Sequence, residues 1–353
     1  GQLGVPSSRS APGALPVLTD AVTASTGAAS SCAVGTDGRL RCWGSNLTGA
    51  LGDGSGVDSL SPVTVGSATT WSKVAVGGEF DGFSGSPAAF ACATRTDGSL
   101  WCWGIATSGQ LGNGSVLEAD TPTRVGTATD WSAITTGAAH ACGLRGTALY
   151  CWGAGTVGQI GDGGSVNRST PTLVAVPSGS TGWATVSAGA NSTCAVTDTG
   201  RAYCWGANTF GQLGNGTTTG SAVPVQVGTD TTWAKISAGA GTTCAVRTDA
   251  TLWCWGYNAV GQVGDGTVTQ RPSPVQIGTG YATVSVTAYA FDPTEAHACA
   301  TKTAGTLWCW GGNSYGQLGD GTTTAHIAPS QVGSGTRWAA VSAGDTHTLA
   351  IRG

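Results

Sequence analysis

The apolar residues of this chain fall in short runs separated by glycine-rich turns, and the same order of runs recurs about every fifty residues. One complete unit has a first segment at 233–239, a second that begins at Cys244, a third at 252–256 and a fourth at 273–278. Short segments bounded by glycine and proline are typical of β-strands. The pattern therefore predicts four short strands in each unit and an all-β protein.

Each of six units holds two cysteines that bracket the turn between its second and third segments. Between Cys32 and Cys42 the turn contains Asp37-Gly38, and a three-residue loop with Gly38 in the left-handed conformation places the two sulfurs opposite each other. Directly opposed residues of a hairpin have the Cβ separation that a disulfide needs. We therefore predict six local disulfides that use all twelve cysteines: Cys32–Cys42, Cys92–Cys102, Cys142–Cys151, Cys194–Cys204, Cys244–Cys254 and Cys299–Cys309.

The third pair tests this interpretation, because its interval is one residue shorter than the others. Its turn is Gly146-Thr147, and a two-residue loop with glycine first suits a type II′ turn, which restores the same register. Zinc is disfavoured because the chain contains no Cys-x-x-Cys and only four histidines. We expect neither a metal nor a cofactor.

Composition and charge limit the compartment and the classes of partner that we expect. Twelve cysteines paired in this way indicate an oxidising compartment, so we expect a secreted, extracellular or cell-surface protein. The net charge of −4 and the absence of Lys/Arg clusters argue against nucleic acid and against an anionic membrane as partners. No apolar run is long enough to span a bilayer. The first residue is Gly1, which we interpret as the start of a mature or excised segment.

The unit predicts the architecture, because its period suits one propeller blade of four strands. We predict a seven-bladed β-propeller that forms a single domain over residues 1–353. The seventh blade is expected to be shared between about residues 1–17 and 335–353, so that the N- and C-terminal segments close the ring. The third strand of this blade appears at neither end, so the blade either has three strands or is completed by residues outside this chain. The seven first-strand signatures begin at Thr19, Trp71, Trp131, Trp183, Trp233, Tyr281 and Trp338.

The stretch from Cys204 to Thr217 reads Cys-Trp-Gly-Ala-Asn-Thr-Phe-Gly-Gln-Leu-Gly-Asn-Gly-Thr and resembles the regulator of chromosome condensation repeat. The resemblance covers nearly all of the chain and implies a seven-bladed propeller. Nuclear members exchange guanine nucleotide on a small GTPase and bind chromatin, but the paired cysteines and the lack of a basic tail disfavour both activities. The Gly-Trp-Arg-His-Thr motif of the related plant ultraviolet-B photoreceptor is missing. The family's secreted bacterial branch, which includes a propeller that inhibits β-lactamase, implies a binding role.

Most conspicuous polar and aromatic residues recur with the unit, so we interpret them as structural. The Asp or Asn after each Gly-Gln-Leu-Gly tetrad precedes a glycine and suits a turn that satisfies backbone donors. The tryptophans are expected to pack between blades. Three histidines share one repeat position: His140, His297 and His347.

Two units depart from the common length and supply the candidate site. The interval from the first-strand aromatic residue to the first cysteine is usually 11, but it is 21 from Trp71 to Cys92 and 18 from Tyr281 to Cys299. As equivalent loops, the two insertions are expected on the same face of the disc, nearly opposite each other across the central opening. Aromatic and acidic residues there suit a ligand or protein contact. The candidate binding residues are Glu79, Phe80, Asp81, Phe83, Tyr289, Phe291, Asp292 and Glu295.

The sequence thus favours an extracellular, disulfide-bonded interaction module that binds a protein or glycan at a cell surface through one face, without enzymatic activity. One alternative is a structural subunit of a surface assembly or appendage, in which self-assembly or a partner strand completes blade seven. The other is a glycan-active enzyme that uses carboxylates of the two insertions as acid and base.

Overall fold

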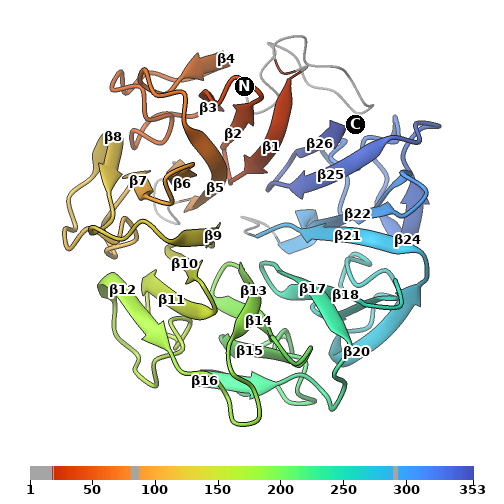
Figure 1. Ribbon diagram of the computed structural model, residues 1–353. Coiled ribbons are helices and arrows are strands. Elements are labelled where there is room, and N and C mark those ends of the chain that lie inside the picture. Colours follow the sequence, from red (N-terminus) through yellow and green to blue (C-terminus); the bar gives the residue numbers. More distant parts are fainter. Residues whose placement is uncertain (1–17, 19, 81–86, 289–292) are drawn as a thin grey trace.

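A computed structural model describes residues 18, 20–80, 87–288 and 293–353 of the chain. These residues form six four-stranded antiparallel sheets and one two-stranded sheet, arranged around a central axis (Figure 1). Within each sheet the strands pair in chain order, so that neighbours in sequence are neighbours in space. The predicted seven-bladed β-propeller is confirmed, with the two-stranded sheet as the described part of blade seven.

The strands are short, as the apolar runs predict. Blades one to three contain β1 (Ala21–Thr26), β2 (Ser30–Gly35), β3 (Leu40–Gly44), β4 (Ser59–Thr64), β5 (Trp71–Phe80), β6 (Pro87–Arg95), β7 (Leu100–Gly104), β8 (Ala119–Arg124), β9 (Trp131–Thr136), β10 (His140–Arg145), β11 (Ala148–Gly153) and β12 (Arg168–Val174). Blades four to seven contain β13 (Trp183–Ala188), β14 (Ser192–Thr197), β15 (Ala202–Gly206), β16 (Ser221–Gln226), β17 (Trp233–Ala238), β18 (Thr242–Arg247), β19 (Leu252–Gly256), β20 (Arg271–Gly278), β21 (Tyr281–Val286), β22 (His297–Lys302), β23 (Leu307–Gly311), β24 (His326–Gln331), β25 (Trp338–Ala343) and β26 (Thr348–Arg352).

All six predicted disulfides are present, each between directly opposed residues of the second and third strands. Gly38 has φ 68°, as the three-residue loop requires. In the shorter hairpin Arg145 pairs with Ala148, which leaves Gly146 and Thr147 as a two-residue loop with φ 56° at Gly146. The change of turn therefore preserves the register of the Cys142–Cys151 pair, as predicted.

Tryptophan joins each of blades two to six to the blade before it. The indole of Trp255 is fully buried and donates a hydrogen bond to the backbone oxygen of Gln212, in the tetrad of the preceding blade, at 2.9 Å. Close approach is possible because a Cβ on Gly214 would lie 2.6 Å from the indole nitrogen of Trp255. The same bond recurs at four other interfaces, which confirms the predicted packing of tryptophan between blades: Trp103–Ala50, Trp152–Gln110, Trp205–Gln159 and Trp310–Gln262.

Hydroxyl groups join the first strands around the inner wall of the ring. The side-chain hydroxyl of the fifth residue of a first strand accepts a hydrogen bond from the backbone N–H of the sixth residue of the first strand of the next blade. The bond from Thr26 N to Ser342 Oγ (3.1 Å) links blade one to blade seven and closes the ring. Blade two has Ala75 at this position and therefore cannot make the bond. The six hydroxyl acceptors are Ser25, Thr135, Ser187, Ser237, Ser285 and Ser342.

Strand direction defines two faces of the disc. First strands end and second strands begin on the face that we call the insertion face. The connections after the third strands lie on the same face, because Ser45 N–H donates to Ala29 O at 2.9 Å. The turns between second and third strands lie on the opposite face, which we call the hairpin face. The predicted contribution of residues 1–17 to blade seven lies outside the described residues.

Candidate functional site

The insertion of blade two lengthens a hairpin. Strands β5 and β6 stay paired from Trp71↔Arg95 to Phe80↔Pro87, so β5 has ten residues where the other first strands have six. Gly78 N–H donates to Gly137 O of blade three at 3.1 Å, and a Cβ on Gly78 would lie 2.5 Å from Ala88 O. Much of the expected loop is therefore regular sheet that projects from the insertion face and is held by the neighbouring blade.

The insertion of blade six contains a short 3-10 segment, η2 (Pro293–Glu295), before β22. The side chain of Glu295 is half-buried and its Oε2 accepts a hydrogen bond from Gln317 Nε2 at 2.9 Å. The same Nε2 also donates to Glu295 O at 3.1 Å. Gln317 belongs to the tetrad of blade six, so the carboxylate of Glu295 holds the insertion against its own blade.

The structure thus places the described parts of both insertions on one face, as expected for equivalent connections. Glu79 and Phe80 lie at the end of β5, and Glu295 ends η2. The flanking Phe90 is fully buried and occupies the repeat position that His140 holds in blade three. The other candidate residues lie outside the described residues: Asp81, Phe83, Tyr289, Phe291 and Asp292.

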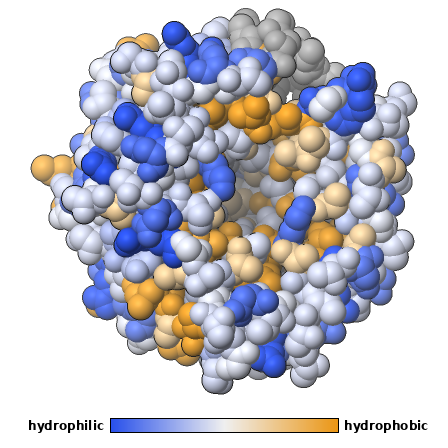
Figure 2. Space-filling view, in the orientation of Figure 1, coloured by the Kyte–Doolittle hydropathy of each residue, from blue (hydrophilic) through white to orange (hydrophobic). Residues whose placement is uncertain are grey.

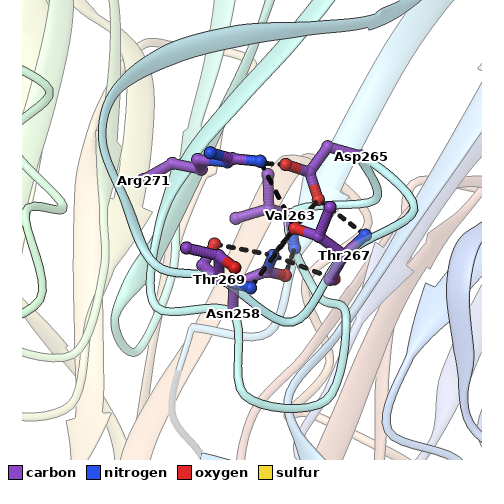
Figure 3. A network of polar contacts seen from close by, with 6 residues as sticks. All are labelled: Asn258, Val263, Asp265, Thr267, Thr269 and Arg271. Atoms are coloured by element: carbon purple, nitrogen blue, oxygen red, sulfur yellow. Dashed lines mark hydrogen bonds and ion pairs between the residues drawn. The ribbon is translucent and has the colours of Figure 1, made fainter.

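The aspartates after the tetrads form turn networks, as predicted. In blade five Asp265 Oδ1 accepts hydrogen bonds from the backbone and hydroxyl of Thr267 (3.0 and 2.7 Å), and its Oδ2 accepts one from Arg271 Nε at 2.6 Å (Figure 3). The side chain of Asn258 donates to Thr267 O and Thr269 O and accepts from Val263 N–H. These bonds to backbone groups hold the loop in place. Partial burial raises the pKa of Asp265, but the hydrogen bonds from Thr267 and Arg271 outweigh burial and leave this pKa below its ordinary value.

The three repeat-position histidines are buried at blade interfaces, which confirms their structural interpretation. His140 Nε2 lies 2.9 Å from Thr193 Oγ1 of blade four, and His347 Nε2 lies 2.9 Å from Ser31 Oγ of blade one. His297 Nε2 lies 2.8 Å from Thr348 Oγ1 of blade seven. Burial lowers the pKa of His140 and of His347 to about 4, and burial together with the charge of His347 lowers that of His297 to about 3. All three are therefore neutral at pH 7.

The hairpin face carries a second repeated feature that the sequence analysis missed. In blade five the guanidinium of Arg247 lies between the rings of Trp233 and Trp253, at 4.5 and 3.9 Å from the ring centroids. Blades two, three and six stack a cation on two aromatic rings in the same way, and blade seven stacks one on a single ring. The signal was a basic residue at the end of the second segment, five or six positions before an aromatic residue: Arg95, Arg145, Arg247 and Lys302.

The view along the axis shows a disc hollowed at its centre, with apolar side chains gathered around the opening and hydrophilic ones more often toward the rim (Figure 2). Across the described ranges, no group of three or more His, Cys, Asp or Glu side chains is placed to hold a metal ion. In the same ranges, no helix has the length and apolar character needed to cross a membrane.

These features define a disulfide-bonded β-propeller built from an RCC1-type unit. The family model described as "Regulator of chromosome condensation (RCC1) repeat" matches residues 97–144, 148–196, 199–246 and 304–351, and a second model of this repeat matches 183–212 and 233–262. The matches cover more than half of the chain. The chain belongs to the regulator of chromosome condensation repeat family, as its resemblance implied.

Solved structures show the same fold. Human WBSCR16 is similar with a TM-score of 0.83 and 19% identity, over 100% of this chain and 96% of that chain. Prp20p from Saccharomyces cerevisiae is similar with a TM-score of 0.76 and 17% identity, over 93% of this chain and 81% of that chain. A structure of Kap60 bound to yeast RCC1 (Prp20) gives 0.75 and 17%, over 93% and 80%. At these identities the likeness establishes the propeller fold.

Proposed function

We propose that this protein is an extracellular interaction module whose insertion face binds a protein or glycan at a cell surface. The observation that carries the proposal is the position of the two long departures from the repeat, which both extend from this face. A propeller of repeated blades is a rigid support, and its specific contacts come from the segments that differ between blades. The lengthened β5–β6 hairpin offers such a segment, and it is anchored to blade three through Gly78.

The disulfides support the proposed compartment. Six disulfides persist in oxidising surroundings and are rare in proteins kept in reducing ones. A binding role is supported by the yeast relative, whose structures concern binding to Gsp1p and histones and a complex with Kap60. These partners are not assigned to this chain, because a similar fold does not imply the same binding partner.

The contact of Glu295 favours binding over glycan hydrolysis. The side chain of Glu295 is engaged by Gln317, and this contact accounts for its orientation without a catalytic role. If the protein were a glycan-active enzyme, Glu79→Gln or Glu295→Gln would abolish turnover while leaving the fold intact. We expect no such turnover in the wild-type protein.

The proposal is tested by binding of the oxidised protein to arrays of surface proteins and glycans. The test variant has the insertions of blades two and six cut back to the common repeat length. A matched control shortens the connection 175–182 on the hairpin face, which is three residues longer than the equivalent connection 126–130. We expect binding to be lost in the first variant and kept in the control. Equal binding by both variants would contradict the proposal, and no binding by the wild type would favour a structural subunit.

A further inference from the structure

Two adjacent connections on the insertion face expose apolar and acidic side chains together. They are residues 53–60 of blade one and 113–120 of blade two, each including the first two residues of the fourth strand that follows, β4 or β8. We call these two segments together the acidic–apolar patch. Val57 and Leu117 are 66% and 75% exposed, and Leu60 and Val116 are also more than half exposed. The two segments therefore hold four of the fourteen exposed large apolar side chains of the described residues.

The two connections form one continuous surface. Gly54 N–H donates a hydrogen bond to Asp120 O at 3.0 Å, and a Cβ on Gly49 would lie 2.6 Å from the Cα of Asp120. The loop that precedes residues 53–60 contacts the hairpin of blade two, because Thr48 Oγ1 donates to Ala89 O of β6 at 2.8 Å. Thr48 thus links the acidic–apolar patch to the segment on which the proposed function rests.

Its carboxylates lack the cations that neutralise the same connections in other blades. In blades three, five and six the residue six positions after the aspartate is Arg168, Arg271 or His326, and each lies within 2.7 Å of its aspartate. The equivalent residues in blades one and two are Ser59 and Ala119, and residues 53–60 and 113–120 contain no Lys, Arg or His. The side chains of Asp58, Glu118 and Asp120 are exposed, and none of them has a basic neighbour within its own segment. Asp58 Oδ1 accepts a hydrogen bond from Asn46 N–H at 2.7 Å, but this bond leaves the negative charge of the carboxylate unneutralised.

The combination specifies the chemistry of the partner. Exposed aliphatic side chains gain free energy only when another apolar surface covers them, and like-signed carboxylates favour a cationic one. Stacking on sugar rings needs aromatic side chains, and these two connections contain none. We propose that the acidic–apolar patch is the docking surface for a protein segment that presents Lys or Arg beside aliphatic side chains. This inference rests on the proposed function and names the partner class of the same face.

Three fluorescein-labelled synthetic dodecapeptides test the chemistry: one alternates Lys with Leu, one Lys with Ser, and one Glu with Leu. Binding to the oxidised full chain is measured by fluorescence anisotropy at low and high salt. We expect the Lys–Leu peptide to bind, the other two to bind at least tenfold more weakly, and the affinity to fall with salt. Equal affinity for the Lys–Ser peptide would overturn the apolar part of the proposal, and equal affinity for the Glu–Leu peptide would overturn the acidic part.

Two charge variants locate the site. The first is Asp58→Asn, Glu118→Gln and Asp120→Asn. The second, Asp97→Asn, Asp198→Asn and Asp249→Asn, removes the same charge from exposed turns of the hairpin face. We expect at least a tenfold loss of Lys–Leu binding in the first variant and less than a twofold change in the second. Equal losses would show attraction to net charge alone and would overturn the proposal.

The partners found on the arrays distinguish failure of the proposed function from failure of the acidic–apolar patch. A partner that needs the two insertions but binds the first charge variant as well as wild type contradicts the patch and leaves the proposed function standing. The absence of any array partner contradicts the proposed function, while the peptide measurements still decide the patch. Loss of a glycan, but not of a protein, in the charge variant would also overturn the assignment of a protein segment.

Discussion

Lowering the pH from 7 to 5 is expected to destabilise this propeller steeply, because His140, His297 and His347 are buried as neutral side chains. Their pKa values in the folded protein are about 4, 3 and 4, below the ordinary value of 6.5. Unfolded histidine is protonated below pH 6.5, so the unfolded chain binds more protons between the two values. The stabilisation is therefore complete above pH 6.5 and is lost progressively as the pH falls toward 4.

The size of the effect follows from proton linkage. At pH 5 each unfolded histidine is mostly protonated and each folded one is mostly neutral, which amounts to about 2 kcal/mol per histidine and about 6 kcal/mol for three. Aspartates add little in this range, because their ordinary pKa is about 3.9 and they are ionised at pH 5 in both states. The interval from pH 7 to pH 5 therefore isolates the histidines from the turn aspartates.

Urea unfolding of the oxidised protein at pH 7 and pH 5, followed by tryptophan fluorescence, measures this difference. The repeat supplies the control, because Thr242 stands in blade five where His140 stands in blade three. His140→Thr removes one of the three sites and is expected to reduce the pH dependence by about a third, whatever its effect at pH 7. A difference below about 1 kcal/mol between the two pH values, or an unchanged difference in the variant, would refute the reasoning.

Three further predictions concern stability. Ala75→Ser supplies the hydroxyl that blade two lacks on the inner wall and should raise the free energy of unfolding by about 1 kcal/mol. Ser285→Ala should lower the free energy of unfolding by about the same amount. Unchanged urea midpoints in both variants would exclude the proposed ring of hydrogen bonds. Ala250, with φ 63°, is the one non-glycine residue with positive φ in the described backbone. Ala250→Gly should therefore stabilise the protein by about 1 kcal/mol. Thermal unfolding at a lower temperature in this variant than in the wild type would argue against strain at the turn. Replacing Cys244 and Cys254 together by alanine should cost about 3 kcal/mol, measured by urea unfolding. Peptide mapping of the wild-type protein without reductant should recover the six local disulfides, and a long-range pair would disprove the hairpin assignment.

Much of the fold was predictable because its signals are local. A disulfide joins residues nine or ten positions apart, so turn length and strand alternation sufficed to pair all twelve cysteines. The unit also predicted four strands, since its glycine turns and apolar runs are read within fifty residues. The structural role of the aspartates followed from their place before glycine, and Asp265 shows it directly.

The candidate site was less predictable. The interval from Trp71 to Cys92 identified an insertion but did not distinguish a loop from an extended hairpin, because the pairing of Glu79 with Ala88 depends on cross-strand contacts. The role of Glu295 depended on Gln317, which is 22 residues away in the chain. The acidic–apolar patch became visible only when the connections of different blades were compared in space.

The sequence by itself determined the repeat, the strands, the turns and the disulfides, because each depends on residues close together in the chain. The tertiary structure decided which groups meet at the blade interfaces, such as Ser31 with His347 across 316 positions. It also decided which charges are neutralised and which remain exposed on the insertion face. The physical reason is that burial and charge pairing depend on every neighbour in space, whereas the repeat specifies only the neighbours within its own blade.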